Sequence, residues 1–368
     1  MNIKRFGVPV VLAVVATLAL SSCAANEEAA PAASGGASDA PTYEGTLNGI
    51  GSSAQGTAQT TWIAGFQTAN SGATINYDPQ GSGAGRTNFI AGAADFAGSD
   101  AALKPEELSG DLSASKCATG TLPIDLPVYI SPIAVFYNVE GVKDLKLDSA
   151  TIAGIFKGTI TTWDDKAIAD QNKGVTLPSA PITTVHRSDD SGTTQNFTDY
   201  LHATAPDVWD AAPAQTFPYQ VGDAAKGTSG VVDAVKGAAN AIGYADESGI
   251  GDLPAAQIKV GDEYVKLSAE GAADVVAASP VADGREANDL AIAIDRTNTD
   301  KNAYPLVLVS YLIVCQQYTD ADLGTLVKGY ASYIVSDAGQ KAAAEQAGSA
   351  PLSADLAKTV AAAVETIK

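Results

Sequence analysis

Side chains that bind metal ions tightly are scarce in this sequence. Its 368 residues include two histidines and three cysteines. The histidines, His186 and His202, do not have the spacing of a metal motif, whereas a structural zinc site needs four such ligands. We therefore expect no metal ion and no cofactor.

Positive charge is also in short supply. The chain has 22 Lys and Arg against 42 Asp and Glu, which gives a formal net charge of −20. Such an acidic surface excludes nucleic acid as a partner and excludes docking on anionic lipid through a basic patch. Because the overall field repels anions, any bound anion must be held by donors close to it.

An apolar run at residues 6–20 follows Lys4 and Arg5 and is too short for a comfortable membrane span. It is typical of a signal peptide. The run ends in Leu-Ser-Ser-Cys, which resembles the bacterial lipobox, where a lipid is attached to the cysteine after cleavage before it. We predict a signal peptide at residues 1–22, whose loss removes two basic residues and changes the net charge from −20 to −22. An ordinary signal peptide followed by an incidental cysteine is the alternative.

Residues 24–41 are small and polar and include proline and glycine, as in a flexible tether. Together with Cys23 they form the predicted lipidated tether, residues 23–41. The protein is thus expected to be exported and held at the outer face of the cell membrane. In that oxidising compartment the two remaining cysteines, Cys117 and Cys315, are expected to form a disulfide.

Residues 186–201, HRSDDSGTTQNFTDYL, have the pattern of an anion-binding helix start. Arg187 precedes a tight Ser-Asp-Asp-Ser-Gly turn, and Thr193 and Thr194 then open a helix. Free N–H groups and the positive end of the helix dipole meet there. Arg187 adds a planar, permanently charged fork suited to an oxyanion. An N-capped surface helix with an unrelated arginine is the alternative.

Two earlier segments repeat the order of strand, glycine-serine turn and helix. In the first, a strand ends near Ile50 and a turn follows at residues 51–54; in the second, the strand is 75–78 and the turn 81–86. The residues expected to face inward from the two helices are Trp62, Ile63, Phe66, Phe89 and Ile90. Glycine permits close approach to a ligand, and serine can cap a helix or donate to an anion. Three such turns indicate helix starts that converge on one small anion.

The turn at residues 81–87 is not a nucleotide-binding P-loop, because it is one residue short and Arg86 stands where lysine is required. A short strand further along ends in Ser99 and Asp100. Asp100 can cap a helix expected near Lys104. Beside an anion site, an acidic residue is useful only if the ligand carries a proton to donate.

In order and spacing, these motifs resemble those of the phosphate-binding lipoproteins and periplasmic proteins that supply bacterial phosphate ABC importers. The resemblance extends from about Gly49 to the C-terminal region. The segments that carry it are residues 49–53, 81–85, 95–100, 158–165, 187–193, 227–230 and 241–244.

The resemblance implies a phosphate site built from residues of all three turns. The implied donors to phosphate are Ser53, Ala54, Ser82, Ser191, Gly192 and Thr193. Asp100 would accept the proton of the ligand. Arg187 would form a charge-assisted pair with the ligand and would itself be oriented by Asp189.

The implied fold is α/β, the two-lobed (type II) periplasmic binding protein fold, with two crossovers and a ligand cleft between the lobes. With crossings near Tyr129 and Tyr304, lobe I comprises residues 42–129 plus 304–368 and lobe II comprises 130–303. Both Cys117 and Cys315 then belong to lobe I, so a disulfide between them is compatible with cleft opening. The implied partners are inorganic phosphate and the membrane permease subunits of a phosphate ABC importer, and we expect a monomer.

A proton distinguishes phosphate from sulfate near neutral pH, because phosphate keeps at least one and sulfate keeps none. An ionised Asp100 accepts a hydrogen bond from phosphate and repels sulfate. A binding protein of the same fold for sulfate or molybdate is an alternative that Asp100 disfavours. An extracellular phosphatase using Ser53 or Ser191 as nucleophile would need a base or a metal, and the sequence lacks a nucleophile-elbow motif. A structural lipoprotein or adhesin would leave the ordered motifs without a purpose.

Overall fold

The computed structural model describes residues 42–368. The predicted signal peptide (1–22), the lipid site Cys23 and the tether (23–41) lie outside the described residues. In the described part, no helix combines the length and the apolar composition that a membrane span requires.

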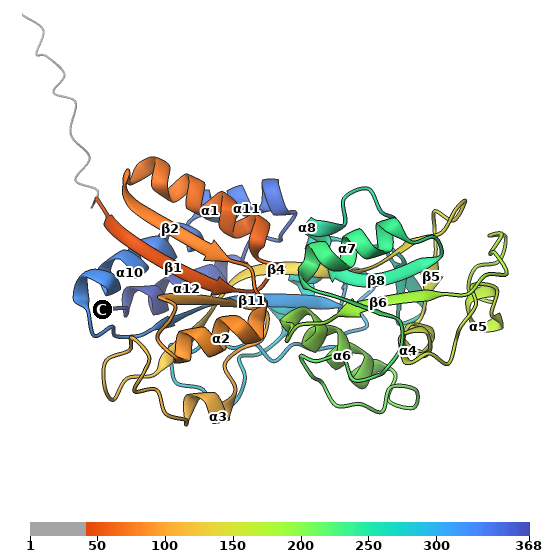
Figure 1. Cartoon of the computed structure of the whole chain (residues 1–368), viewed down its shortest axis with the longest axis horizontal. Coiled ribbons are helices and arrows are strands. Elements are labelled where there is room, and N and C mark those ends of the chain that lie inside the picture. Colours follow the sequence, from red (N-terminus) through yellow and green to blue (C-terminus); the bar gives the residue numbers. More distant parts are fainter. Residues whose placement is uncertain (1–41) are drawn as a thin grey trace, which may run out of the picture. The chain divides into compact units, whose positions relative to one another are not determined.

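The largest element of the described chain is an eight-stranded mixed sheet (Figure 1). Its strands, in spatial order, are β2 (Gly72–Asp78), β1 (Glu44–Gly51), β3 (Phe96–Ser99), β11 (Val307–Cys315), β4 (Pro123–Asn138), β8 (Ala241–Asp246), β6 (Thr183–Arg187) and β7 (Asp223–Ala225). Pairing is parallel at both ends of the sheet and antiparallel around β11 and β4. A smaller sheet comprises β10 (Glu263–Val265), β9 (Gln257–Val260) and β5 (Lys146–Leu147).

The long strand β4 connects the two ends of the main sheet. Residues 123–132 pair with β11, and from Ile133 onward β4 pairs with β8, beginning at Asp246. Nearly every residue of β4 is buried, which fits its mostly apolar sequence, with Asp125 and Ser131 as buried polar residues. One irregularity interrupts its pairing with β11. Ser310 lies opposite Tyr129 and Tyr311 lies opposite Pro127, so Val128 forms a β-bulge.

Helices pack on both ends of the sheet, which confirms the predicted α/β class. Around β1–β3 lie α1 (Gly56–Ala69), α2 (Ser82–Ile90) and α10 (Ala321–Val335), with α11 (Asp337–Ala347) and α12 (Ala354–Glu365) packed on α1 and α10 (Figure 1). Around β6 and β8 lie α6 (Gly192–Thr204) and α7 (Gly227–Gly237), with α4 (Ser149–Lys157) on α6. The other helices are α3 (Pro105–Leu108), α5 (Lys166–Ala169), α8 (Glu247–Ile250) and α9 (Ala269–Ala278).

The turns and helices predicted from local sequence are present. Trp62 and Phe66 of α1 and Phe89 of α2 are buried, while Ile63 and Ile90 are partly buried against the same core. The helix expected near Lys104 is α3, which begins at Pro105. Asp100 does not cap it and is free for another role.

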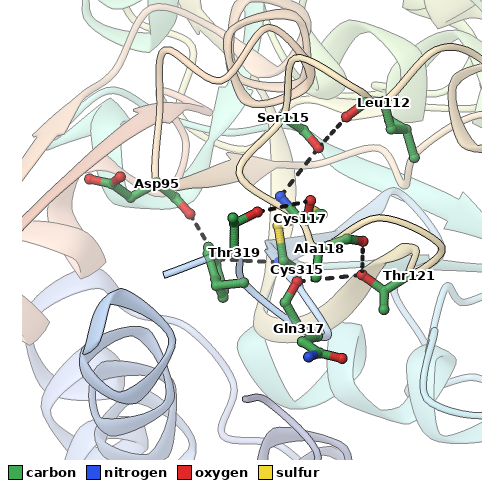
Figure 2. Close-up of a disulfide and its surroundings, with 10 residues drawn as sticks. Asp95, Leu112, Ser115, Cys117, Ala118, Thr121, Cys315, Gln317 and Thr319 are labelled. Carbon is green, nitrogen blue, oxygen red and sulfur yellow. Dashed lines mark hydrogen bonds between the residues drawn. A yellow bond between two sulfur atoms is a disulfide. The ribbon is translucent and has the colours of Figure 1, made fainter. Parts of the chain in front are cut away.

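The predicted disulfide between Cys117 and Cys315 is present (Figure 2). It joins the end of β11 to the irregular segment before β4, and the two Cα atoms lie 5.1 Å apart. Around it, Ser115 accepts a hydrogen bond from the Cys117 N–H, and the Gln317 carbonyl accepts one from the Ala118 N–H. The bond closes a loop of 198 residues.

Candidate functional site

Asp100 is the centre of a cluster in which three of the predicted segments meet. It follows β3, is 4% exposed, and its N–H donates to the Ser82 hydroxyl at the start of α2 (3.0 Å). The Thr193 hydroxyl, at the start of α6, donates to Asp100 Oδ2 (3.1 Å). Two helix starts therefore meet at Asp100, one hydrogen-bonded to its backbone N–H and the other to its carboxylate.

Glycine at position 192 permits this close approach. A Cβ atom there would lie 2.6 Å from Ser82 Oγ and 2.7 Å from Asp100 Cβ, which is closer than such atoms can pack. The neighbouring Ser191 caps α6, since its hydroxyl oxygen accepts the Thr194 N–H (3.1 Å). This leaves the Gly192 and Thr193 N–H groups, which begin the helix, as donors for an anion.

The buried Arg187 and the partly buried Asp189 form an ion pair next to this cluster. Arg187 Nε donates to Asp189 Oδ1 (2.8 Å) and Nη2 donates to Oδ2 (2.5 Å). The Gly227 N–H also donates to Asp189 Oδ1 (3.0 Å). Among residues 42–368, the Arg187 Nη1 group makes no hydrogen bond, so Asp189 holds the arginine by one edge and leaves the other for a ligand.

The pKa of Asp189 is lowered below its usual value. Burial raises it, but the hydrogen bonds and charge of Arg187, together with the Gly227 N–H, outweigh the effect of burial. The carboxylate is thus held in its charged form, which keeps the bidentate pair intact. Glycine at position 81, with φ of 107°, leaves room for this carboxylate, because a Cβ atom there would lie 2.4 Å from Asp189 Oδ2.

Ser53 and Ala54 lie in the turn between β1 and α1 and have different hydrogen-bond partners. The Ser53 hydroxyl accepts the Thr228 N–H (3.0 Å) and lies 3.1 Å from the Thr228 hydroxyl. The Ala54 N–H donates to the Ser52 hydroxyl (3.1 Å) and is therefore already occupied. Backbone bonds connect this turn to the cluster, from Ser52 N–H to the Gly98 carbonyl and from the Gly81 N–H to the Gly51 carbonyl (2.8 Å each).

Contacts around the cluster also include residues to which the sequence analysis gave no role in the site. Asn196 donates to the carbonyl oxygens of Asp100 (2.7 Å) and Gly192 (2.9 Å). Tyr244 lies 2.7 Å from the Thr194 hydroxyl, and burial raises its pKa to about 12, so it stays a neutral phenol. Asn196 lies four residues after Gly192, so both face the same side of the helix. This spacing is the signal in the sequence that could have pointed to Asn196.

Two surface grooves are lined in part by residues of the candidate site. One, of about 820 Å³, is lined by Ser53, Gln80, Lys226 and Thr228, among others. The other, of about 440 Å³, is lined by Asp100, Asn196, Arg285, Arg296 and Tyr311, among others. Within residues 42–368, no group of three His, Cys, Asp or Glu side chains is arranged to hold a metal ion.

Comparison with known proteins identifies the fold and the family. A family model described as a PBP superfamily domain matches residues 32–338. A high-affinity periplasmic phosphate-binding protein, PfluDING, solved with bound phosphate, has a TM-score of 0.70 at 24% identity over 86% of this chain and 93% of its own. A putative phosphate ABC transporter substrate-binding protein from Clostridium perfringens has a TM-score of 0.59 at 20% identity, covering 82% and 98%. The predicted two-lobed periplasmic binding protein fold is confirmed.

Closer relatives are found by sequence. The phosphate-binding protein PstS 2 of Mycobacterium tuberculosis is 35% identical over the full length of both chains. PstS 3 of Mycobacterium leprae is 36% identical over 90% of each chain. Within the PBP superfamily, the chain belongs to the PstS family of phosphate-binding proteins. This is a family of transport binding proteins and not of enzymes, as predicted.

Proposed function

We propose that the protein captures inorganic phosphate in a cleft at the Asp100 cluster and delivers it to the permease of a phosphate ABC importer. The observation that carries the proposal is a buried carboxylate set among donors. Asp100 is an acceptor, whereas Arg187 Nη1 and the Gly192 and Thr193 N–H groups are donors. A tetrahedral oxyanion that retains a proton satisfies both kinds of group.

The proposed phosphate-binding residues are Ser53, Ala54, Ser82, Asp100, Arg187, Ser191, Gly192 and Thr193, with Asp189 orienting Arg187. Relatives named as phosphate-binding proteins, and similar folds solved with bound phosphate, support this ligand. The Ala54 N–H needs to exchange its Ser52 partner for the ligand, since it already donates to that hydroxyl.

We further propose that the cleft separates two lobes, residues 42–129 plus 304–368 and residues 130–303. Support comes from β4, whose partner changes from β11 to β8 a few residues after Tyr129. Contacts between Ser53 and Thr228 and between Asp100 and Thr193 cross this division. Phosphate that contacts both sides would favour the closed arrangement over the open one.

The remaining parts of the proposal concern location. PstS-type proteins work outside the cytoplasm, and the lipobox-like sequence before Cys23 supports lipid anchoring at the outer face of the cell membrane. A monomer with one cleft, tethered through residues 23–41, would deliver phosphate to the permease subunits in the same membrane.

Calorimetric titration tests the ligand assignment directly. The full-length chain, purified in mild detergent and freed of carried-over phosphate, is titrated with phosphate and then with sulfate at neutral pH. Tight one-to-one phosphate binding without sulfate heat is the expected result. Binding of both anions would refute the proton-based selection by Asp100, and binding of neither would refute phosphate capture itself.

A further inference from the structure

A buried chain of hydrogen bonds ends on the carboxylate that faces the proposed ligand. The Ser310 hydroxyl on β11 donates to Asp100 Oδ1 (2.7 Å). Ser310 in turn accepts a hydrogen bond from Gln55 Nε2 (2.9 Å), which also donates to the Tyr311 carbonyl (3.1 Å). Gln55 directly follows the Ser53-Ala54 turn, so one residue connects the two parts of the site.

The chain continues away from the site through α1 to α10. Gln59 Nε2 donates to Gln55 Oε1 (2.8 Å), and the Tyr330 hydroxyl donates to Gln59 Oε1 (2.7 Å). Gln55, Gln59 and Ser310 have no exposed surface, and Tyr330 is 1% exposed. Four successive hydrogen bonds therefore point in the same direction, toward Asp100.

A backbone carbonyl fixes this direction. The Tyr311 carbonyl can only accept, so the Gln55 atom that faces it must be the amide nitrogen. Gln55 Oε1 then accepts from Gln59, and the Ser310 oxygen receives a proton from Gln55. The single hydroxyl proton of Ser310 is left for Asp100 Oδ1.

A protonated Asp100 Oδ1 would conflict with this arrangement. Its proton would meet the Ser310 hydroxyl, whose own proton would then need another acceptor in a buried site. The other oxygen, Oδ2, already accepts from Thr193 in this arrangement. Both oxygens of the carboxylate thus accept hydrogen bonds from hydroxyl donors, so the arrangement presents Asp100 as an acceptor.

We infer that Ser310 and Gln55 are specificity-determining positioning residues, which hold Asp100 as a hydrogen-bond acceptor so that the site selects oxyanions carrying a proton. This inference rests on the proposed phosphate-binding function. Neither residue needs to touch the ligand. Ser310 acts through Asp100, and Gln55 acts through Ser310.

Sulfate is the probe that isolates this effect. It carries no proton near neutral pH and cannot donate a hydrogen bond to Asp100, so its binding reports how strictly the site requires a donor from the ligand. Competition of sulfate against labelled phosphate is measured on the full-length chain in detergent at one neutral pH, so that both ligands are in the same state for every variant.

Three variants divide the hydrogen-bond chain. Ser310→Ala removes the donor to Asp100 and should lower the sulfate inhibition constant relative to the phosphate Kd by about tenfold to a hundredfold, the equivalent of one hydrogen bond to a charged group. Gln55→Met leaves that hydroxyl free to turn and should cause a smaller shift in the same direction. Tyr330→Phe breaks the far end of the chain and serves as the matched control, with a sulfate inhibition constant like that of the parent.

The outcomes separate the inference from the function on which it rests. If the parent binds no phosphate, the proposed function fails. If the parent binds phosphate and rejects sulfate, but Ser310→Ala and Gln55→Met both give the parent's sulfate inhibition constant, only the inference is overturned. An equal shift in Tyr330→Phe and Ser310→Ala would overturn it as well, because a structural effect of lost packing would then explain both.

Discussion

Replacing Asp246 with asparagine should make the protein more stable at alkaline pH. Asp246 ends β8, has no exposed surface, and accepts hydrogen bonds at Oδ1 from the Tyr129 hydroxyl (3.1 Å) and the Ser248 N–H (3.0 Å). Among the described residues, its Oδ2 atom has no hydrogen-bond partner. Burial raises the pKa of this carboxyl from 3.8 to about 7.

The size of the effect follows from the shift in pKa. In the unfolded chain Asp246 loses its proton above about pH 4, whereas in the folded chain it keeps the proton up to about pH 7. Stability therefore falls as pH rises through this window and levels off above it. At 1.36 kcal/mol per pH unit, the interval from pH 5 to pH 7 corresponds to roughly 2.5 kcal/mol. Asparagine keeps the Oδ1 acceptor and removes the charge.

Urea denaturation of parent and Asp246→Asn at about pH 5, 6, 7 and 8 measures this difference. The two free energies of unfolding should diverge with rising pH, the variant gaining roughly 2.5 kcal/mol relative to the parent. Asp233→Asn, which changes an exposed carboxylate on α7, is the matched control and should run parallel to the parent. Parallel curves for Asp246→Asn as well would refute the reasoning.

Three further predictions concern the ligand and the disulfide. Asp100→Asn should strengthen sulfate competition at neutral pH by about a hundredfold, because an amide can donate where the carboxylate repels; an unchanged sulfate inhibition constant would contradict this. Arg187→Ala should raise the phosphate Kd about a hundredfold or more in calorimetry, with an unchanged circular dichroism spectrum, and an unaltered Kd would place the site elsewhere. Replacing Cys117 and Cys315 together by alanine should cost about 5 kcal/mol of stability, from the entropy of a 198-residue loop, and leave the phosphate Kd unchanged within about threefold. A loss below about 1 kcal/mol in denaturant titration would count against the loop-entropy account.

Local sequence was sufficient to predict the helix starts. Glycine, serine and threonine at residues 51–54, 81–86 and 191–194 have the turn and capping chemistry that begins a helix, and α1, α2 and α6 start there or shortly after. The role of Asp189 beside Arg187 was implied by the family resemblance, and the ion pair between them spans two residues of the sequence. The predictions of the helix starts rest on preferences that operate over a few residues.

Long-range contacts could not be predicted in this way. Ser310 and Asp100 are 210 residues apart, and Ser53 and Thr228 are 175 residues apart. Ser310 is a polar residue inside a strand whose every position is buried, and this was the one available signal. A buried hydroxyl needs a partner, but the sequence does not show which one.

The bulge at Val128 decides on which side of the sheet the first part of β4 places its side chains. Pro127 lies opposite Tyr311, so Asp125 lies opposite Ile313, on the Tyr311 side, where Arg285 donates to its carboxylate. Without the bulge, Val128 would lie opposite Tyr311 and Asp125 would lie opposite Val314, on the other side of the sheet, as a buried charge without its cation. A related chain that lacks the residue at Val128 would have a regular strand here and would still place Asp125 opposite Ile313, so this is a position where the strand can lose a single residue.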